Sequence, residues 1–464
     1  MKFTRGLLVA SVALVAGCAV GPDYKRPEIV VADSYKEQVG WKASEPNDAL
    51  NHGSWWEIYH DDVLNRLEQQ VNLSNENIKA AVAAVDEAQA LVKQAQAGFW
   101  PTLSVNASKN RTGAGTAGPQ ASDRVGASVS WTADIWGQIR RTVEGDRASA
   151  LSSLAALASA RLSEQAQLAS TYFQLRAQDR LQSLLDDTVA DQEQSLKITE
   201  SRYKFGVASK ADVVTARTQL LNSQSQQANA AIKRALLEHA LAVLVGQQPA
   251  TFSLSPAPMP TVVPTIPPGL PSTLLERRPD IAEAERRVEA ANAQIGVAKS
   301  AFFPSLTLSG TDNFTHNGFD GLVNASNRVW AFGPALAETV FDGGARTART
   351  AQARAAFEAS VDNYRQTVLS GFQQVEDAVV TLRVLEKQAV ISEAAVAAAR
   401  EAEALTLSQY KGGTVQYISV ISSQTTRLNS EVSALTVLLD RLTGSVTMIE
   451  AVGGGWSQAE LAAK

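Results

Sequence analysis

Few residues in this 464-residue chain could carry out covalent or metal chemistry. The sequence has one cysteine, Cys18, and four histidines scattered along the chain: His52, His60, His239 and His316. One cysteine cannot form an intramolecular disulfide, and the histidines lack the spacing of a metal site or of a base beside a nucleophile. We therefore expect no catalytic residue and no metal ion, and we predict that the chain is not an enzyme.

Cys18 ends a segment with the layout of a bacterial lipoprotein signal. Lys2 and Arg5 give it a charged start, a short apolar run follows, and Val15-Ala16-Gly17 precedes the cysteine. The apolar run is too short to span a membrane. We predict removal of residues 1–17 and acylation of Cys18, whose covalent acyl chains would anchor the mature chain and need no other cofactor. An ordinary signal peptide with a chance cysteine is the alternative.

Two glycine-rich stretches resemble phosphate-binding loops without the structure that such loops need. Residues 113–118 (GAGTAG) fit the spacing G-x-G-x-x-G, yet Pro119 follows and no helix is predicted to begin there. We interpret residues 113–118 as a flexible extracellular loop and residues 453–455 as a flexible tail.

The composition indicates a folded chain without a nucleic-acid partner. Hydrophobic residues make up 45% of the chain and charged residues 19%, so enough apolar surface is present for a packed core. The formal net charge of -5 gives no basic field that would attract a phosphate backbone.

The sequence contains two related halves. Residues 77–101 align without gaps with residues 280–304, and the alignment matches Pro101 with Pro304. Residues 135–137 and 341–343 also fall in corresponding places, and so do residues 203–206 and 410–413. We predict an internal duplication of a unit of about 200 residues.

Each half contains a helix much longer than a globular domain requires. Apolar residues recur at three- and four-residue steps in residues 77–97, and residues 139–205 and 345–410 favour helix throughout, with Gly145 as one interruption. At 1.5 Å per residue, each of the two longer segments would form a rod of about 100 Å. A glycine-containing turn and a return helix follow each rod.

Between the short and the long helix of each half, apolar and polar residues alternate. This pattern predicts strands over residues 102–110, 125–133, 305–312 and part of 328–340, with turn-forming segments between them. Aromatic residues gather at the strand ends: Phe99, Trp100, Trp131, Trp136, Phe302, Phe303, Trp330, Phe332 and Phe341. Such girdles are typical of transmembrane β-barrels, although core aromatics are the alternative.

Four strands are too few for a closed barrel, because bacterial barrels have at least eight. No segment after the signal has eighteen consecutive apolar residues. A mature chain that spans a membrane would therefore have to use its strands, and several copies would have to share one barrel.

Six motifs follow one another along the chain. They are residues 18–27 (CAVGPDYKRP), 55–56 (WW), 134–137 (DIWG), 274–281 (LLERRPDI), 303–305 (FPS) and 341–344 (FDGG). In this order they resemble the outer membrane factor family of TolC- and OprM-like channels, in particular its NodT-type branch of RND efflux lipoproteins. The resemblance implies an α+β membrane protein: a homotrimer with a twelve-stranded outer-membrane β-barrel, four strands per chain, continued by a long α-helical periplasmic barrel.

The resemblance also implies a function and partners. The protein would be the exit duct of a tripartite efflux pump, lipid-anchored in the outer membrane. It would pass drugs, toxic organic molecules or metal ions from an inner-membrane RND-type transporter and a periplasmic adaptor, a membrane fusion protein, to the exterior. A channel for type I polypeptide secretion is one alternative, and a lipid-tethered helical spacer without a pore is another.

The resemblance assigns roles to residues in the two hairpin tips. The residues expected to close the periplasmic end and contact the adaptor are Arg202, Tyr203, Gly206, Val207, Ser209, Tyr410, Gly413 and Thr414. Related channels carry an acidic gate just past the tips. Asp212 keeps an acid there, whereas Ser419 and Ser422 stand where an acid is common, so we expect a weaker or differently placed gate.

These features divide the chain into predicted parts. Residues 1–17 are the signal peptide, 18–60 the lipidated equatorial segment, 61–246 the first repeat, 247–272 a proline-rich linker, 273–445 the second repeat and 446–464 the tail. Four residues mark the helix–strand junctions: Pro101, Gly137, Pro304 and Gly343.

Overall fold

The structure is a computed structural model that describes residues 19–32, 34–36, 54–114, 117–266 and 277–454. The predicted signal peptide, Cys18, residues 274–276 of the LLERRPDI motif and residues 455–464 lie outside the described ranges. Two compact units make up the chain. The first contains the segment that ends at Ile29, Ala83–Ala155 and Ile281–Thr367, and the second contains Val30–Val82, Ala156–Asp280 and the chain from Val368 onward.

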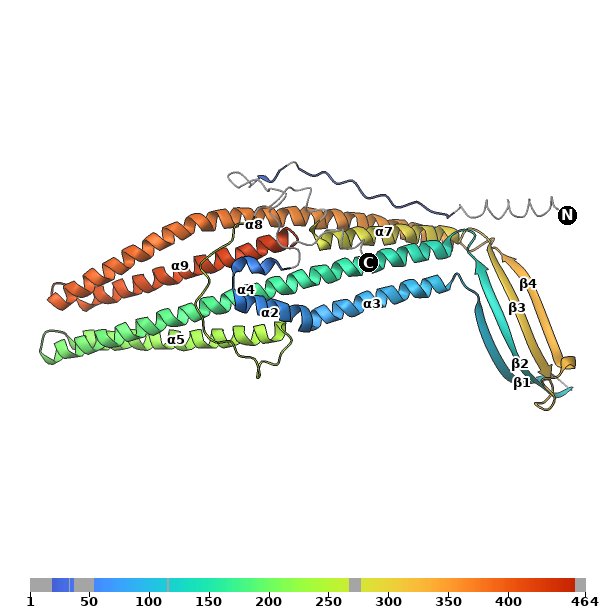
Figure 1. Ribbon diagram of the computed structural model, residues 1–464, viewed down its shortest axis with the longest axis horizontal. Helices are drawn as coiled ribbons and strands as arrows, with labels where there is room; N and C mark the ends of the chain where they lie inside the picture. Colours follow the sequence, from blue (N-terminus) through green and yellow to red (C-terminus); the bar gives the residue numbers. More distant parts are fainter. Residues whose placement is uncertain (1–18, 33, 37–53, 115–116, 267–276, 455–464) are drawn as a thin grey trace. The chain divides into compact units, whose positions relative to one another are not determined.

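The two halves of the sequence contain the same order of elements (Figure 1). In the first half, α3 (Glu76–Ala97) leads to β1 (Thr102–Ala114), β2 (Ala117–Ala133), α4 (Gln138–Lys204) and α5 (Lys210–Leu244). In the second half, α7 (Pro279–Ser300) leads to β3 (Ser305–His316), β4 (Arg328–Ala337), α8 (Ala345–Gly412) and α9 (Tyr417–Ala451). The predicted helices and strands are thus confirmed in type and order.

Three short elements were not indicated by the sequence patterns. The 3-10 helix η2 (Trp55–Tyr59) and the helix α2 (Asp62–Ser74) precede α3, and η3 (Ala325–Asn327) lies between β3 and β4. The Trp55-Trp56 motif belongs to η2 and is buried. Trp55 donates from Nε1 to Oε1 of Gln165 at 3.2 Å, and Tyr59 shares a hydrogen bond of 2.6 Å with Ser445. This motif therefore has a packing role within the second unit.

The two long helices are continuous over 67 and 68 residues. Neither α4 nor α8 contains proline, so nothing removes a backbone donor or forces a kink. Gly145, expected to interrupt the first rod, lies inside α4. A Cβ at this position would lie 3.5 Å from the Cβ of Ala293 in α7. This is an ordinary van der Waals distance, so α4 packs on α7 at this position and the glycine does not end the helix.

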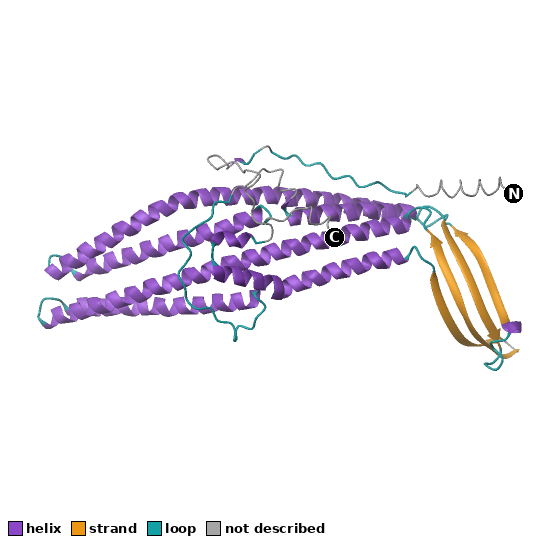
Figure 2. Ribbon diagram, viewed as in Figure 1, coloured by secondary structure: helices purple, strands orange, loops and turns teal. Residues whose placement is uncertain are grey.

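The four strands form one antiparallel sheet in the order β1-β2-β3-β4 (Figure 2). The two hairpins join where β2 pairs with β3, from Asp123 opposite His316 to Ala133 opposite Leu306. The strands are longer than predicted, because the β1–β2 ladder continues through Arg111 opposite Ala121. The prediction of a loop over residues 113–118 is wrong for the described residues among them, which belong to β1 and β2. Backbone pairing needs no apolar side chains, so the alternating pattern ended before the strands did.

Candidate functional site

The sheet has one apolar and one polar face. Directly opposed residues of an antiparallel sheet share a face. The register places Leu103, Val129, Gly310 and Phe332 on one face and Ser104, Ser128, Thr311 and Ala331 on the other. Five large side chains of the apolar face are at least 70% exposed: Leu103, Val105, Trp330, Phe332 and Leu336. An uncovered apolar face opposite a polar face is the arrangement of a barrel wall between lipid and water.

One described helix, α9, is also long and apolar enough to cross a membrane by length and composition. Many of its apolar residues pack within the helical part of the second unit. Val420, Val437, Leu442, Val446 and Ile449 are almost completely buried. The exposed apolar strand face therefore remains the better candidate for lipid contact.

Matching turns connect the sheet to the two long helices. Gly137 and Gly343 adopt the left-handed backbone conformation, with φ of +78° and +62°. Just before Gly137, Asp134 accepts the backbone N–H of Ile139 at 2.8 Å and binds Nε of Arg140 at 3.1 Å. Beside Gly343, Asp342 binds Nε of Arg346 at 2.7 Å and accepts its backbone N–H at 3.1 Å. Each aspartate thus caps the start of a long helix.

The two prolines of the predicted junctions lie where a helix passes into a strand. Pro101 and Pro304 immediately precede β1 and β3. Nε1 of Trp136 donates to the carbonyl of Pro304 at 2.7 Å, and its ring stacks on Phe303 with centroids 4.6 Å apart. Nε1 of Trp131 donates to the carbonyl of Phe99 at 2.9 Å. Aromatic residues at the strand ends therefore bind the junction backbone through their polar edges.

The segment that follows Cys18 lies along the helices of the first unit. Val20 donates its backbone N–H to the carbonyl of Trp136 at 3.0 Å. Ala19 is so close to Gly137 that a Cβ there would lie 2.9 Å from the Ala19 Cα. Further along, Arg141 binds Asp23 at 2.8 Å and Asn292 donates to the carbonyl of Pro22 at 2.9 Å. The residue after Cys18 is therefore held at a helix–strand junction.

The first hairpin tip joins α4 to α5. Gly206 has φ of +74°, and Val207 donates its backbone N–H to the carbonyl of Arg202 at 2.8 Å, which closes the end of α4. Ser209 begins α5 with a reciprocal capping box, because its hydroxyl accepts the backbone N–H of Asp212 and its own N–H binds the Asp212 carboxylate. The predicted gate acid Asp212 is thus also a helix cap.

The second hairpin tip joins α8 to α9. Gly413 has φ of +79°, and both the backbone N–H and the hydroxyl of Thr414 donate to the carbonyl of Gln409 at 3.0 Å. Of the remaining gate candidates, Ser419 is half-buried and Ser422 is exposed in the first two turns of α9.

The two tips contact each other. Nη1 of Arg202 donates to the carbonyl of Tyr410 at 3.0 Å, and its guanidinium lies 4.8 Å from the centroid of the Tyr410 ring. Tyr410 is only 4% exposed and packs against Tyr417, with ring centroids 5.3 Å apart. Its role is therefore in the core that joins the tips, together with Ala216 and Val420.

Apolar side chains at the tips face solvent in the described chain. Tyr203, Phe205, Val207 and Ile418 are 47%, 76%, 64% and 59% exposed. Phe205 and Ile418 were not among the predicted tip residues, although Phe205 lies within the predicted turn. Exposed apolar residues grouped at two adjoining turns are suited to bind another protein.

Past the tips, charged residues of α4, α8 and α9 form a network that sequence reasoning missed. Arg427 binds Asp191 at 3.0 Å and Glu403 at 2.6 Å, and Arg400 binds Glu431 at 2.7 Å. Burial raises the pKa of Glu403 above its ordinary value, although Arg427 acts in the opposite direction. No local pattern of the sequence indicates this network, because its partners come from three helices. Within the described ranges, no group of three or more histidine, cysteine or acidic residues could hold a metal ion.

Comparison with known proteins gives consistent matches over both halves of the chain. The sequence model of the outer membrane efflux protein family matches residues 67–247 and 270–454. The chain is 28% identical over 466 residues to the probable efflux pump outer membrane protein TtgC of Pseudomonas putida, covering 98% of this chain and 96% of that relative. It is 26% identical over 459 residues to the cation efflux system protein CusC of Escherichia coli O6:H1, covering 97% and 99%.

A solved structure extends these matches to the fold. The outer-membrane channel OprN superposes with a TM-score of 0.85 at 28% identity, covering 95% of this chain and 100% of that one. These matches confirm three predictions: the family of the chain, its location in the outer membrane and its role as a channel that is not an enzyme. Because the family match extends through both helical hairpins and both strand pairs, the chain belongs to the outer membrane efflux protein family.

Proposed function

We propose that the protein is the outer-membrane exit duct of a tripartite efflux pump. Small molecules would pass through it passively, delivered by an inner-membrane RND-type transporter and a periplasmic adaptor. One observation carries this proposal: the same chain contains a sheet with an uncovered apolar face and two long helical hairpins. The relatives named above are described as efflux proteins, one of them for cations, so both organic molecules and metal ions are candidate cargo.

A homotrimer would close the barrel. In the described sheet, β1 and β4 are edge strands that pair on one side only, and unpaired edges favour pairing with another chain. Pairing β1 of one copy with β4 of the next, three times, gives twelve strands, as the family resemblance implies. The helices α5 and α8 also carry pairs of exposed apolar residues at heptad spacing. Val214 and Leu221 lie on α5, and Val384 and Ile391 lie on α8. These stripes are suited to helix–helix contact between copies.

A lipid anchor on Cys18 fits the same arrangement. Ala19 lies at the junction where the sheet begins, so acyl chains on the preceding residue would start at the edge of the apolar strand face. The exposed tip residues Phe205, Val207 and Ile418 would in turn bind the adaptor, at the far end of the hairpins.

Conductance across a planar lipid bilayer tests the duct directly. Purified full-length protein is expected to give discrete single-channel currents, whereas a spacer without a pore would pass no ions. Photo-crosslinking residues at Val207 and Val415 in cells test the docking surface. Capture of an adaptor of a proton-driven pump supports the efflux function, while capture of an adaptor of an ATP-driven secretion system would contradict it. In a Cys18→Ala variant, the protein is expected to lose its acyl chains on mass analysis.

A further inference from the structure

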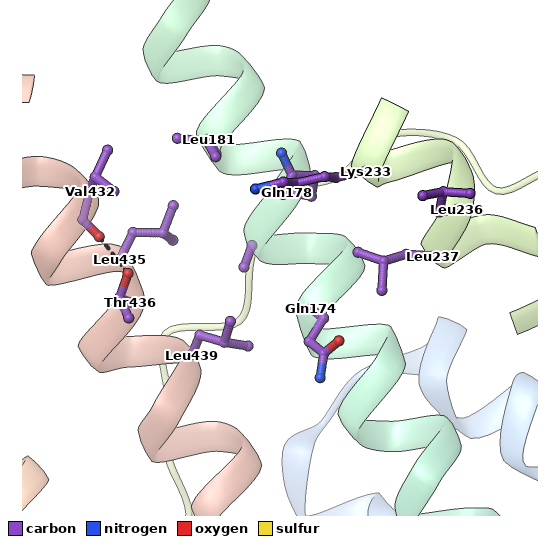
Figure 3. A pocket seen from close by; sticks show the side chains of 11 residues that line it. Gln174, Gln178, Leu181, Lys233, Leu236, Leu237, Val432, Leu435, Thr436 and Leu439 are labelled. Atoms are coloured by element: carbon purple, nitrogen blue, oxygen red, sulfur yellow. Dashed lines mark hydrogen bonds between the residues drawn. The ribbon is translucent and has the colours of Figure 1, made fainter. Parts of the chain in front are cut away.

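A cavity of drug-like size lies within the helices of the second unit (Figure 3). It has a volume of about 490 Å³ and lies between α4, α5 and α9. Cavities of this size hold small organic ligands in many proteins. Most of its wall is aliphatic and is formed by Leu181 of α4, Leu236 and Leu237 of α5, and Val432, Leu435 and Leu439 of α9.

The cavity exists because the three helices separate beyond a tight contact. Leu185 of α4, Ala230 of α5 and Leu428 of α9 form one buried cluster, where the small side chain of Ala230 allows close approach. One to three turns further along each helix, these helices line the open space. The small residue Ala177 forms part of the wall on α4 and leaves the space unfilled.

One buried nitrogen donor of the wall lacks an acceptor, and the same wall includes one exposed ammonium group. Gln178 is 9% exposed, and its buried Nε2 has no hydrogen-bond partner. Lys233 lines the same cavity from α5 with an exposed side chain, and no ion pair involves its ammonium group in the described part of the chain. Figure 3 shows both side chains among the aliphatic ones. A buried donor without an acceptor is costly, and a bound acceptor would remove that cost.

The other polar wall residues do not supply the missing acceptor. The hydroxyl of Thr436 donates to the carbonyl of Val432 at 2.9 Å, and Gln174 is exposed. None of the residues that line the cavity is acidic, so the wall carries a single positive charge from Lys233. The charge pattern therefore favours a ligand with an anionic group.

We propose that this cavity binds a small, apolar organic molecule that carries one carboxylate or sulfonate group. The aliphatic walls take the apolar body, Lys233 pairs with the anionic group, and Nε2 of Gln178 donates to one of its oxygens. This inference rests on the proposed function, because a duct is what would bring such cargo to these helices. It adds a binding site for small anionic organic cargo to an otherwise passive path.

Photolabelling of the purified full-length oligomer tests the site. The probe is 4-benzoylbenzoate, an aromatic carboxylate that cross-links when illuminated, and 4-methylbenzophenone is its uncharged counterpart. The carboxylate probe is expected to label peptides from residues 174–181, 233–237 and 432–439. Lys233→Gln is expected to lower labelling by the carboxylate probe about threefold, as for the loss of one exposed ion pair, and to change labelling by the uncharged probe little.

Matched variants separate binding from folding. Gln178→Leu removes the amide donor on α4 and is expected to lower labelling by the carboxylate probe. Lys197→Gln alters an exposed lysine of α4 outside the cavity and should not change labelling. Leu237→Trp fills the space and should lower labelling by both probes, with circular dichroism as the check on folding. Equal labelling of wild type and Lys233→Gln would overturn the proposal. Labelling of separated chains but not of the oligomer would also overturn it, since a neighbouring copy would then occupy the cavity.

The conductance measurement in a lipid bilayer distinguishes failure of this binding site from failure of the proposed function. A protein that conducts ions but is not labelled in the cavity contradicts the site alone. A protein that is labelled there but never conducts contradicts the duct.

Discussion

Arg202 in the first hairpin tip donates a hydrogen bond of 3.0 Å to the backbone carbonyl of Tyr410 in the second, and it lies over the ring of the same residue. The two residues are 208 positions apart. This contact joins the two turns that end the long helices of one chain, so the equilibrium between joined and separated tips depends on it.

Removal of this contact should loosen the tips. A hydrogen bond from a charged donor contributes about 2 kcal/mol, so Arg202→Ala should shift the equilibrium toward separated tips about thirtyfold. We expect more frequent and longer openings in single-channel recordings. Arg202→Lys keeps the charge without the planar fork and should give an intermediate result. Arg217→Ala removes an exposed arginine paired with Glu200 and serves as the control. Recordings of Arg202→Ala that match wild type would contradict a role in closure.

The cap at Asp342 should make stability depend on acid pH. Arg346 and the backbone N–H groups of Arg346 and Gly344 lower the pKa of Asp342 below its ordinary value of 3.8. A carboxylate with a lowered pKa in the folded state stabilises that state above the ordinary pKa, and this contribution is lost as the pH falls through the lowered value. We expect Asp342→Asn to melt at a lower temperature than wild type at pH 6. The difference should disappear well below pH 3.8, and a difference that stays constant over this range would exclude the assignment.

Asp179 should be required for the attachment of the linker. Its carboxylate accepts from Arg176 at 2.8 Å, from Arg234 at 2.7 Å and from the backbone N–H of Ala257 at 3.2 Å. Arg176 is 1% exposed, so Asp179→Ala leaves a buried guanidinium without its counter-ion. Such a loss costs about 3 to 5 kcal/mol. Denaturant unfolding should report this decrease, and limited proteolysis should cleave residues 251–266 faster than in wild type.

The control for Asp179 is an exposed carboxylate of the same helix. Asp186 accepts from Gln182 and Gln227 at the surface, so Asp186→Ala should cost less than about 1 kcal/mol. Similar losses in the two variants would show that burial of the Asp179 network does not matter.

Glu68 should destabilise the protein at neutral pH. Its side chain is fully buried, neither carboxylate oxygen has a hydrogen-bond partner in the described structure, and burial raises its pKa well above the ordinary value of 4.5. Above pH 4.5 the Glu68 carboxyl is ionised in the unfolded state and must take up a proton on folding. The free energy of unfolding of the wild type therefore falls as the pH rises from 4.5 toward the raised pKa. Glu68→Gln should therefore be more stable than wild type at pH 7 by at least about 1 kcal/mol. The gain should vanish below pH 4.5.

Two outcomes test this explanation of Glu68. Glu76→Gln, at an exposed position of α3, should change unfolding little at either pH. A stabilisation by Glu68→Gln that is as large at pH 3 as at pH 7 would indicate a packing effect, because residue 68 is then almost uncharged in the folded and the unfolded state of both proteins.

The local patterns of the sequence determined the elements and their order. Alternation along residues 102–110, 125–133, 305–312 and part of 328–340 specifies strands with one apolar face, because successive side chains of a strand point to opposite sides. Uninterrupted helix-forming residues without proline specify α4 and α8, and glycine at positions 206 and 413 allows the left-handed turns that end them. The tip residues, the junctions and the polar and apolar strand faces could therefore be located before the structure was known.

Tertiary structure alone decided how these elements meet. Arg202 pairs with Tyr410, and Trp136 donates to the carbonyl of Pro304, although the two members of each pair lie far apart in the sequence. Glu68 is buried because other elements pack over it. The periodicity of the sequence does not predict such contacts, because they depend on which helix and strand faces pack together. Tyr410 is an example: its place in a turn motif suggests a docking surface, yet packing on Tyr417 buries it. A local pattern fixes the conformation of a segment, whereas burial and partner choice follow from contacts made only when distant segments fold against each other.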